Sequence, residues 1–174
     1  MAMLMNANSR RDAEVYSFSW LVSVLVPLAA LGLQAYLPLH FWRFGIVDLP
    51  LIITVYFAVA RRNPIAGTLT GAIIGIAQDA LTQRPLGING ISKTIIGYLA
   101  ASIGVRIDVD NHGTRLILNF GAAMLNSAIT LLIVHRMLAM EAPWSWVHEL
   151  IRAVVNALLA VVLFALLDRA KREN

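Results

Sequence analysis

The feature that most constrains this chain is a long run without any charged side chain, from Val15 to Trp42. Trp20 and Trp42 bracket the run, as tryptophans do at the two interfaces of a membrane. A helix needs about 20 apolar residues to cross the hydrocarbon core, so the run predicts a transmembrane helix over Phe18–Leu39, with Pro27 as a site for a kink. The competing interpretation is a secretory signal peptide, but the run is too long for one and no A-x-A cleavage site follows it.

The apolar character extends beyond this first run. Of the 174 residues, 59% are hydrophobic and 14% are charged, and the mean hydropathy is +0.71. Soluble domains carry about 25% charged residues, and one core of ordinary size would not hide so much apolar surface from water. The composition therefore predicts an integral membrane protein that forms a single domain over residues 1–174. The chain has no cysteine, which excludes disulfides and thiolate metal sites.

Charges and turn residues divide the sequence into apolar segments, which predict an all-α bundle of six transmembrane helices. The predicted spans are Phe18–Leu39, Ile46–Ala60, Pro64–Leu81, Ile88–Val105, Leu116–Val134 and Leu150–Leu167. The second span is short for a hydrocarbon core of about 30 Å, so it either thins the bilayer or leans against neighbouring helices that cover its ends. A polar segment of residues 1–14 precedes the spans, and a basic tail of residues 168–174 follows them.

Lysine and arginine predict the orientation. The net charge is +4, but the basic residues stand mostly between apolar runs, where topology signals occur, and this argues against nucleic acid as a partner. With an inside N-terminus, nine basic residues lie on the inner side, namely Arg10, Arg11, Arg61, Arg62, Arg106, Arg115, Arg169, Lys171 and Arg172. Five lie elsewhere, namely Arg43, Arg84, Lys93, Arg136 and Arg152. Because positive charge concentrates on the cytoplasmic side, both termini are predicted to be cytoplasmic.

Small residues recur along the third and fourth predicted spans. Three glycines of the third span lie at four-residue spacing and therefore share one helix face, and Asp79 continues their row. Small faces let membrane helices approach closely, so the two spans are predicted to pack as an antiparallel hairpin. The predicted helix-packing or partner-binding positions here are Gly67, Gly71, Gly75, Gly97 and Gly104, with Pro85 and Gly87 in the turn.

Asp79 and Lys93 are ionisable residues within the apolar pattern, and both flank this turn. A carboxylate at membrane depth is costly unless it pairs, takes up a proton or reaches water. Asp79 is therefore interpreted either as a binding site for a proton, an ion or a partner's basic residue, or as a structural group that pairs with Lys93 or Arg84. We favour the structural interpretation. Asp48 likewise reads either as a functional carboxylate or as an N-terminal helix cap.

Motifs for catalysis or metal binding are missing. The charged segment Arg106–Arg115 is predicted to be a solvated loop, and its Asp108, Asp110, Asn111 and His112 resemble metal ligands, but the rest of an EF-hand loop is absent. The sequence has no G-x-S-x-G, no H-E-x-x-H and no phosphate loop. We therefore predict that the protein is not an enzyme and has no metal or cofactor. Asn119 and Asn126 are seven residues apart and are expected to face other helices.

The ordered motifs between Asp48 and Arg106 resemble those of the bacterial rod shape-determining protein MreD family. They are Asp48 with Pro50, then Arg61–Arg62–Asn63–Pro64, the glycine row with Asp79, and Pro85–Leu86–Gly87. The resemblance implies a six-helix fold like that of the substrate-binding components of energy-coupling-factor vitamin transporters. It also implies a non-enzymatic role in cell-wall elongation. The implied partners are an MreC-like bitopic protein and, through it, a RodA-type glycosyltransferase with its penicillin-binding transpeptidase.

The predicted function is therefore an inner-membrane scaffold or regulator of rod-type peptidoglycan synthesis, surrounded by membrane lipids. Trp144 and Trp146, in the loop before the last span, are predicted partner contacts because tryptophan is frequent at binding hot spots. Two alternatives stay open: a vitamin transporter's substrate-binding subunit, and a proton- or ion-linked carrier that uses Asp79. The sequence also leaves open which helices contact a partner and whether the chain forms a homodimer.

Overall fold

The computed structural model describes residues 19–107, 109, 111–139 and 144–170. The predicted polar segment 1–14, Asp108, Asp110 and tail residues 171–174 lie outside the described residues. The described chain is helical throughout, in the order α2 (Trp20–His40), η1 (Trp42–Ile46), α3 (Leu49–Arg61), α4 (Pro64–Leu81), α5 (Ile88–Gly104), α6 (His112–Leu132), η2 (Ile133–Met137), α7 (Trp146–Leu167) and η3 (Asp168–Ala170). Of the short elements, η2 is a π-helix, whereas η1 and η3 are 3₁₀-helices.

Five segments of the described chain are long and apolar enough to cross a membrane. They are α2, α4, α7, the continuous stretch His112–Met137 formed by α6 and η2, and the stretch Phe44–Arg61 that contains α3. With 17 residues, α5 is shorter than any of these. The predicted all-α membrane bundle is therefore confirmed, whereas a sixth span formed by α5 stays a prediction.

Three helices begin at other residues than predicted. The second predicted span starts as a helix only at Leu49, because Asp48 caps its first turn and Pro50 follows where no intrahelical N–H is required. The fifth and sixth spans begin about one turn early, because main-chain hydrogen bonding continues through the polar residues that precede the apolar runs. The 3.1 Å bonds from Arg115 N to Asn111 O and from Glu149 N to Ser145 O belong to these early turns.

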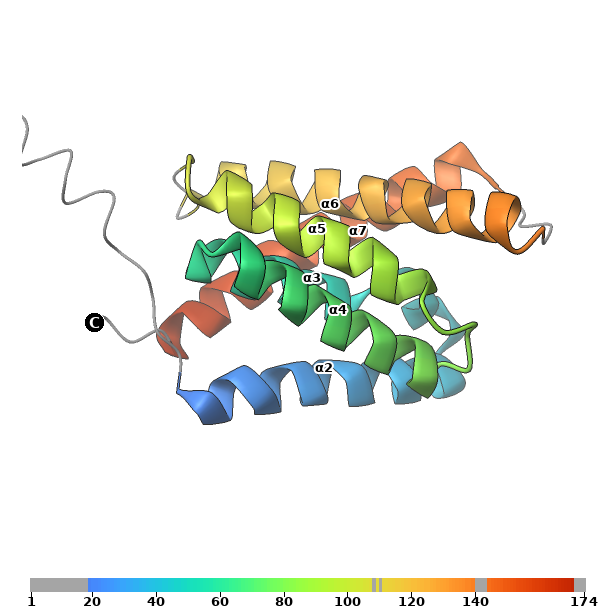
Figure 1. Ribbon diagram of the computed structural model, residues 1–174, viewed down its shortest axis with the longest axis horizontal. Coiled ribbons are helices and arrows are strands. Elements are labelled where there is room, and N and C mark those ends of the chain that lie inside the picture. The colour runs from blue at the N-terminus through green and yellow to red at the C-terminus, as the bar shows by residue number, and fades with distance from the viewer. Residues whose placement is uncertain (1–18, 108, 110, 140–143, 171–174) are drawn as a thin grey trace, which may run out of the picture.

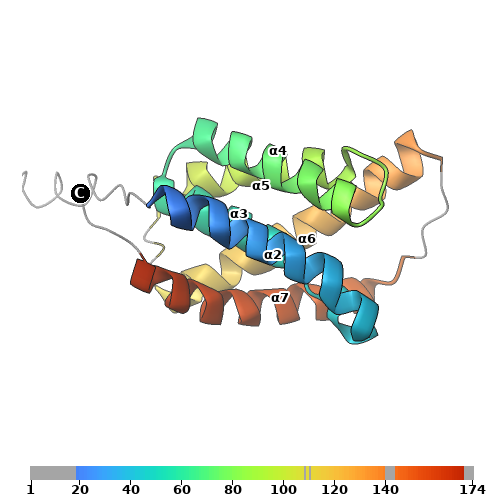
Figure 2. The same ribbon diagram turned by 90° about the horizontal axis from the view of Figure 1, so that it is seen from below.

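Helix α3 forms the centre of the bundle. It contacts α2, α4, α5, α6 and α7, and residues from Pro50 to Ala60 are all buried. In the two views α2 lies on one side of α3 and α6 on the other, with α4 and α5 side by side along it (Figure 1, Figure 2). The neighbouring helices therefore surround α3, which has only 13 residues, so its ends are covered by protein.

Helices α4 and α5 form the closest helix pair, and they are antiparallel as predicted. The glycines of α4 lie directly against the α5 backbone, in the pairs Gly67 with Gly97, Gly71 with Lys93, and Gly75 with Asn89. A Cβ atom added at Gly71 would lie 2.6 Å from the carbonyl carbon of Lys93, a distance that real side chains do not reach. The glycine faces therefore bind each other within the chain, and neither is free for another molecule.

The two ends of the bundle differ in what they carry. The start of α2 and the end of η3 lie at one end, together with the α3–α4 and α5–α6 connections (Figure 1). The opposite end carries η1, the α4–α5 turn and the approach to α7. Pro85 is exposed in this turn, and Gly87 has φ of 105°, a left-handed conformation that glycine adopts without strain.

Candidate functional site: a buried polar network around Asp48

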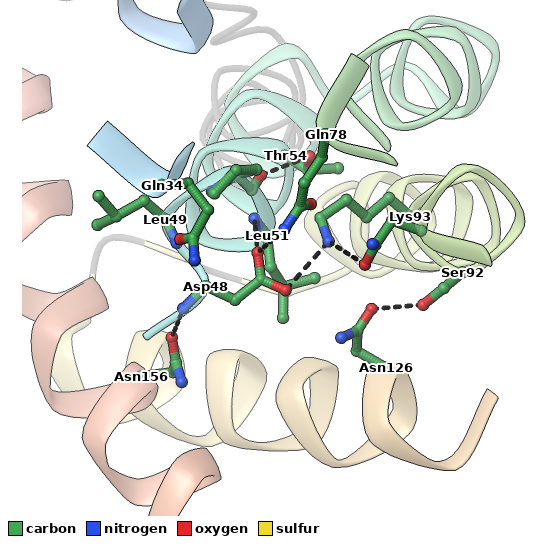
Figure 3. A network of polar contacts seen from close by, with 12 residues as sticks. Gln34, Asp48, Leu49, Leu51, Thr54, Gln78, Ser92, Lys93, Asn126 and Asn156 are labelled. Atoms are coloured by element: carbon green, nitrogen blue, oxygen red, sulfur yellow. Dashed lines mark hydrogen bonds and ion pairs between the residues drawn. The ribbon is translucent and has the colours of Figure 1, made fainter. Parts of the chain in front are cut away.

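Asp48 lies at the start of the central helix and is buried. Its Oδ1 accepts a 3.1 Å hydrogen bond from Leu51 N, so the carboxylate caps α3 as the structural interpretation predicts. The cap accounts for only part of its bonding. The same region also forms the centre of a set of contacts that reach four other helices. Figure 3 shows Gln34, Gln78, Lys93 and Asn156 around Asp48, and we call these residues together with Arg152 the Asp48 network.

The principal contact of the Asp48 network is an ion pair with Lys93 of α5. Lys93 Nζ lies 3.1 Å from Asp48 Oδ2, and the two side chains are 0% and 4% exposed. Arg152 of α7 approaches the same oxygen at 3.9 Å, and its side chain is 22% exposed. Asn89, one turn before Lys93, accepts a second bond from Nζ at 3.2 Å. The buried ammonium is thus held by one charged and one neutral oxygen.

Amide side chains complete the Asp48 network. Asn156 of α7 accepts a 2.7 Å bond from Asp48 N and donates a 2.9 Å bond to Ile46 O. Gln34 of α2 accepts a 3.0 Å bond from Leu49 N, and Gln78 of α4 lies 3.4 Å from Asp48 Oδ1. These bonds satisfy main-chain groups at the start of α3 that would otherwise be buried without partners.

Asp79 forms a separate bonding site at the end of α4. Its carboxylate accepts bonds from Gly87 N at 2.9 Å, from Gly90 N at 3.2 Å and from both the main-chain N and the side-chain Nδ2 of Asn89. The first turn of α5 is therefore capped by a carboxylate from the preceding helix, which its own N-terminal residue Gly87 cannot supply. The favoured structural role of Asp79 in the turn agrees with this geometry.

The predicted ion-pair partners of Asp79 were wrong. Lys93 turns instead to Asp48, and the exposed Arg84 contributes only its main-chain N, which donates to Asp79 O at 3.1 Å. The reason is that the Asp79 carboxylate lies at the N-terminus of α5, where main-chain N–H groups have no partner within the helix. These donors are closer to the carboxylate than any charged side chain is. Asn89 connects the two sites, because its Nδ2 donates to Asp79 and its Oδ1 accepts from Lys93.

Further polar contacts extend from Arg152 toward α6. Arg152 lies 3.8 Å from Glu149, whose carboxylate accepts a 2.5 Å bond from Ser127 of α6. Ser92 of α5 donates to Asn126 of α6. Asn126 and Asn119 are both buried, and Asn119 donates to Arg115 O within its own helix. Asn126 thus bonds another helix as predicted, whereas the Asn119 amide bonds its own helix.

A second polar cluster lies at the opposite end of the bundle. Arg115 of α6 lies 2.6 Å from Asp168, which also accepts a 3.3 Å bond from Tyr56 of α3. Arg115 Nε donates to Val109 O at 2.7 Å. The prediction that Arg106–Arg115 is a solvated loop throughout was wrong at its end, because Arg115 is inside α6 and only 4% exposed.

The structure separates the predicted site residues into groups. Asp79 and Gly87 meet at one turn, the glycines of α4 and α5 meet along the hairpin, and Gly104 packs on Val59 of α3. Trp144 and Trp146 lie elsewhere, with their rings edge to face at 5.3 Å. Sequence analysis did not identify Gln34, Gln78, Asn89, Arg152 or Asn156 as members of a site. Their signal is an amide or charge inside an apolar run, where each such group needs a partner.

The Asp48 network is a structural site whose polar groups bond to groups of the chain itself. Both oxygens of Asp48 are engaged by side chains or main chain of this protein. In the described part of the chain, no three His, Cys, Asp or Glu residues lie close enough together to hold a metal ion. Two hollows lie outside this network, one between α5 and α6 and one beside Trp144, and no residue of the Asp48 network lines either of them.

Fold and site together define a multi-pass integral membrane protein whose helices are joined internally by buried polar groups. The sequence matches the family model described as rod shape-determining protein MreD over residues 15–170, and the chain belongs to this family. The family acts in the determination of rod shape and is not a known enzyme family. Comparisons with curated proteins and with solved structures give no match. The predicted membership is confirmed, and the likeness to vitamin-transporter components stays a prediction.

Proposed function

We propose that this protein is a non-enzymatic scaffold of the rod elongation machinery for peptidoglycan synthesis in the bacterial inner membrane, with both termini in the cytoplasm. The observation that carries this proposal is that the buried carboxylates are occupied by groups of the chain itself. Asp79 accepts from three main-chain amides and one side-chain amide, and Asp48 accepts from Leu51 and faces Lys93. Both carboxylates are buried and bonded within the chain, which supports a structural role for them.

The proposed partner is an MreC-like bitopic protein, which would connect this chain to a RodA-type glycosyltransferase and its penicillin-binding transpeptidase. The glycine faces of α4 and α5 cover each other, so a partner helix needs another surface. A groove of about 450 Å³ between α5 and α6 is lined by apolar side chains and includes Ala100, Gly121 and Ala122. A Cβ added at Gly121 would meet no atom within 4 Å, so this small residue has no packing role inside the bundle. We place the partner's transmembrane helix there, where small residues permit close approach.

Gly121→Leu tests this placement. The leucine fills the groove without disturbing the bundle, so capture of the MreC-like protein from native membranes should fall about tenfold while insertion and thermal stability are retained. Gly32→Leu is the matched control, because Gly32 is also an exposed helical glycine with no atom within 4 Å of its added Cβ. Equal capture by both variants would contradict the groove as the binding surface.

Depletion of the protein in a rod-shaped host tests the wider role, and cell rounding is the expected result. A parallel binding measurement with the purified protein and small vitamins separates the scaffold from a transporter's substrate-binding subunit. Tight vitamin binding, with no MreC-like protein recovered and no shape defect on depletion, would overturn the proposal in favour of the transporter. Flux of protons or ions that is lost in Asp79→Asn would overturn it in favour of a carrier.

A further inference from the structure

A hollow of about 340 Å³ lies where α6 passes into η2, and we call it the tryptophan pocket. Its lining consists of Met124, Ala128, Leu131, Leu132, His135, Arg136, Trp144 and Trp146. The lining changes in character along its length. The part on α6 is entirely apolar, whereas the part on η2 and at the start of α7 carries a guanidinium, an imidazole and two indoles.

The π-helix η2 and the two indoles shape the polar part of the pocket. A π-helix widens the backbone by one residue per turn and is frequent at functional positions. Here it places His135 and Arg136, both exposed, on the pocket side of the helix end. Trp144 and Trp146 stand edge to face at an interplanar angle of 89°, which orients the two rings differently. The polar part of the pocket is thus lined by a guanidinium, an imidazole and two indole rings.

The indole N–H of Trp144 is a buried donor without an acceptor. Its Nε1 atom is inaccessible to solvent and has no hydrogen-bond partner among the described residues. An unmet donor of this kind is unfavourable, and buried Trp N–H groups normally find a partner. An acceptor supplied by a bound molecule would satisfy it once the Trp144 ring turns its N–H toward the pocket.

The charge of the pocket indicates what that acceptor is. Arg136 supplies a permanent positive charge, and none of the described lining residues is acidic. Glu149, on the first turn of α7, is engaged elsewhere by Ser127 and Arg152. A guanidinium beside a neutral N–H donor matches an anionic oxygen, and arginine forms charge-assisted bonds with phosphate groups such as those that lipid headgroups carry.

We propose that the tryptophan pocket binds an anionic phospholipid, with its phosphate at Arg136 and Trp144 Nε1 and an acyl chain along Met124–Leu132. The pocket lies at the end of the apolar stretch His112–Met137, the depth at which lipid headgroups stand. The apolar part accepts a hydrocarbon chain and the polar part accepts a phosphate, so both halves of one amphiphile are matched. This site is independent of the partner surface proposed above.

Native mass spectrometry of the full-length protein in detergent tests the proposal with dioctanoyl phosphatidylglycerol as the probe. Trp144→Phe keeps an aromatic ring but removes the N–H together with the five-membered ring, and Arg136→Gln keeps a polar side chain but removes the guanidinium and its charge. Each should weaken binding by about tenfold, as expected when a hydrogen bond to a charged group is lost. Trp20→Phe and Arg84→Gln are matched controls, because both residues are exposed and lie outside the pocket.

Ligands that carry only one half of the lipid show whether the bound phosphate belongs to a lipid or is a free anion. Dioctanoylglycerol, which lacks phosphate, should bind at least about tenfold more weakly than the phospholipid. Binding of inorganic phosphate as tight as that of the phospholipid would overturn the lipid in favour of a free anion. Unchanged phospholipid binding in both variants would also overturn the proposal, and loss of protein-partner capture in those same variants would then assign the pocket to a protein.

Discussion

Lys93 illustrates how a membrane bundle can hold a charge in its centre. Its side chain is fully buried, and its ammonium is held by Asp48 at 3.1 Å and by Asn89 at 3.2 Å. Moving both charges out of water costs several kcal/mol per ion, roughly what their attraction returns, so the pair contributes little net stability relative to an apolar pair. Its effect is on specificity instead, because α3 and α5 can satisfy both charges in one register only.

Removal of one member of this pair should therefore be much more harmful than removal of both. Lys93→Met leaves Asp48 buried with only the more distant Arg152 as a cation, and should lower the free energy of unfolding by about 3–5 kcal/mol. The double variant Asp48→Asn with Lys93→Met should recover part of this loss, since asparagine still caps α3. Unfolding by denaturant in mixed micelles measures both values. A double variant that is less stable than Lys93→Met alone would contradict the argument.

Asp79 should couple to Asn89 and not to a cation. Asp79→Asn replaces one acceptor oxygen by an amide NH₂ group that faces main-chain N–H groups. The change should lower the free energy of unfolding by about 1–3 kcal/mol. A double-mutant cycle with Asn89→Ala should give a coupling energy above about 0.5 kcal/mol, because Asn89 Nδ2 donates to Asp79 at 2.7 Å. The cycle with Arg84→Gln should give none, because the Arg84 side chain is exposed. Coupling to Arg84 in place of Asn89 would restore the ion pair predicted from sequence.

From the sequence, the important buried polar residues were easier to identify than the groups to which they bond. An aspartate in an apolar run must be satisfied internally, so the structural role of Asp79 was predictable from local sequence. The Asp48–Lys93 pair joins residues 45 positions apart, and it depends on how α3 and α5 rotate against each other. Several helix orientations satisfy the apolar pattern equally well, so the pattern alone does not determine which polar groups meet.

At the scale of the element, the α4–α5 hairpin was the most predictable part of the molecule. Glycines at four-residue spacing place a smooth face on one helix regardless of what surrounds it, and a short turn brings the next helix back against that face. The contacts of Gly67 and Gly71 with α5 agree with this expectation. What the spacing did not predict is which residues of α5 meet the glycines, because Gly71 lies against Lys93 and Gly75 lies closest to Asn89, neither of which is a glycine.

The glycine face gives a prediction with an internal control. Gly71→Ala places a Cβ 2.6 Å from the Lys93 carbonyl carbon, so α4 and α5 must separate, and the variant should lose about 1–3 kcal/mol of stability. Gly121→Ala makes the same chemical change in open space on α6 and should be neutral or stabilising by up to about 1 kcal/mol, because alanine favours the helix. Thermal unfolding in detergent compares the two. Equal midpoints would show that the hairpin is looser than its geometry indicates.

On the scale of the whole molecule, the polar groups are buried inside the bundle. Asp79 caps α5 at the α4–α5 turn, Arg115 and Asp168 join α6 to η3, and the buried Asn126 and Asn156 stand well inside α6 and α7, which carry further polar bonds between the two ends. The exposed side chains along α2 and α4 between these ends are mainly apolar, as a lipid-facing surface requires. The arrangement fixes the direction of the membrane normal along the bundle but not which end faces the cytoplasm.

The bias of Lys and Arg toward the end that carries the termini predicts that this end is cytoplasmic, and the absence of cysteine from the chain makes the prediction directly testable. Single cysteines placed at Arg84 and at Arg106 report opposite ends, because both residues are exposed and lie in different connections. In intact spheroplasts a membrane-impermeant maleimide should label Arg84→Cys and should reach Arg106→Cys only after the membrane is opened. Because each substitution also removes one positive charge, Leu86→Cys and Ile107→Cys, both exposed in the same connections, serve as charge-neutral controls. Labelling of the position-106 and position-107 variants from outside, with the position-84 and position-86 variants protected, would invert the topology and move the tryptophan pocket to the cytoplasmic leaflet.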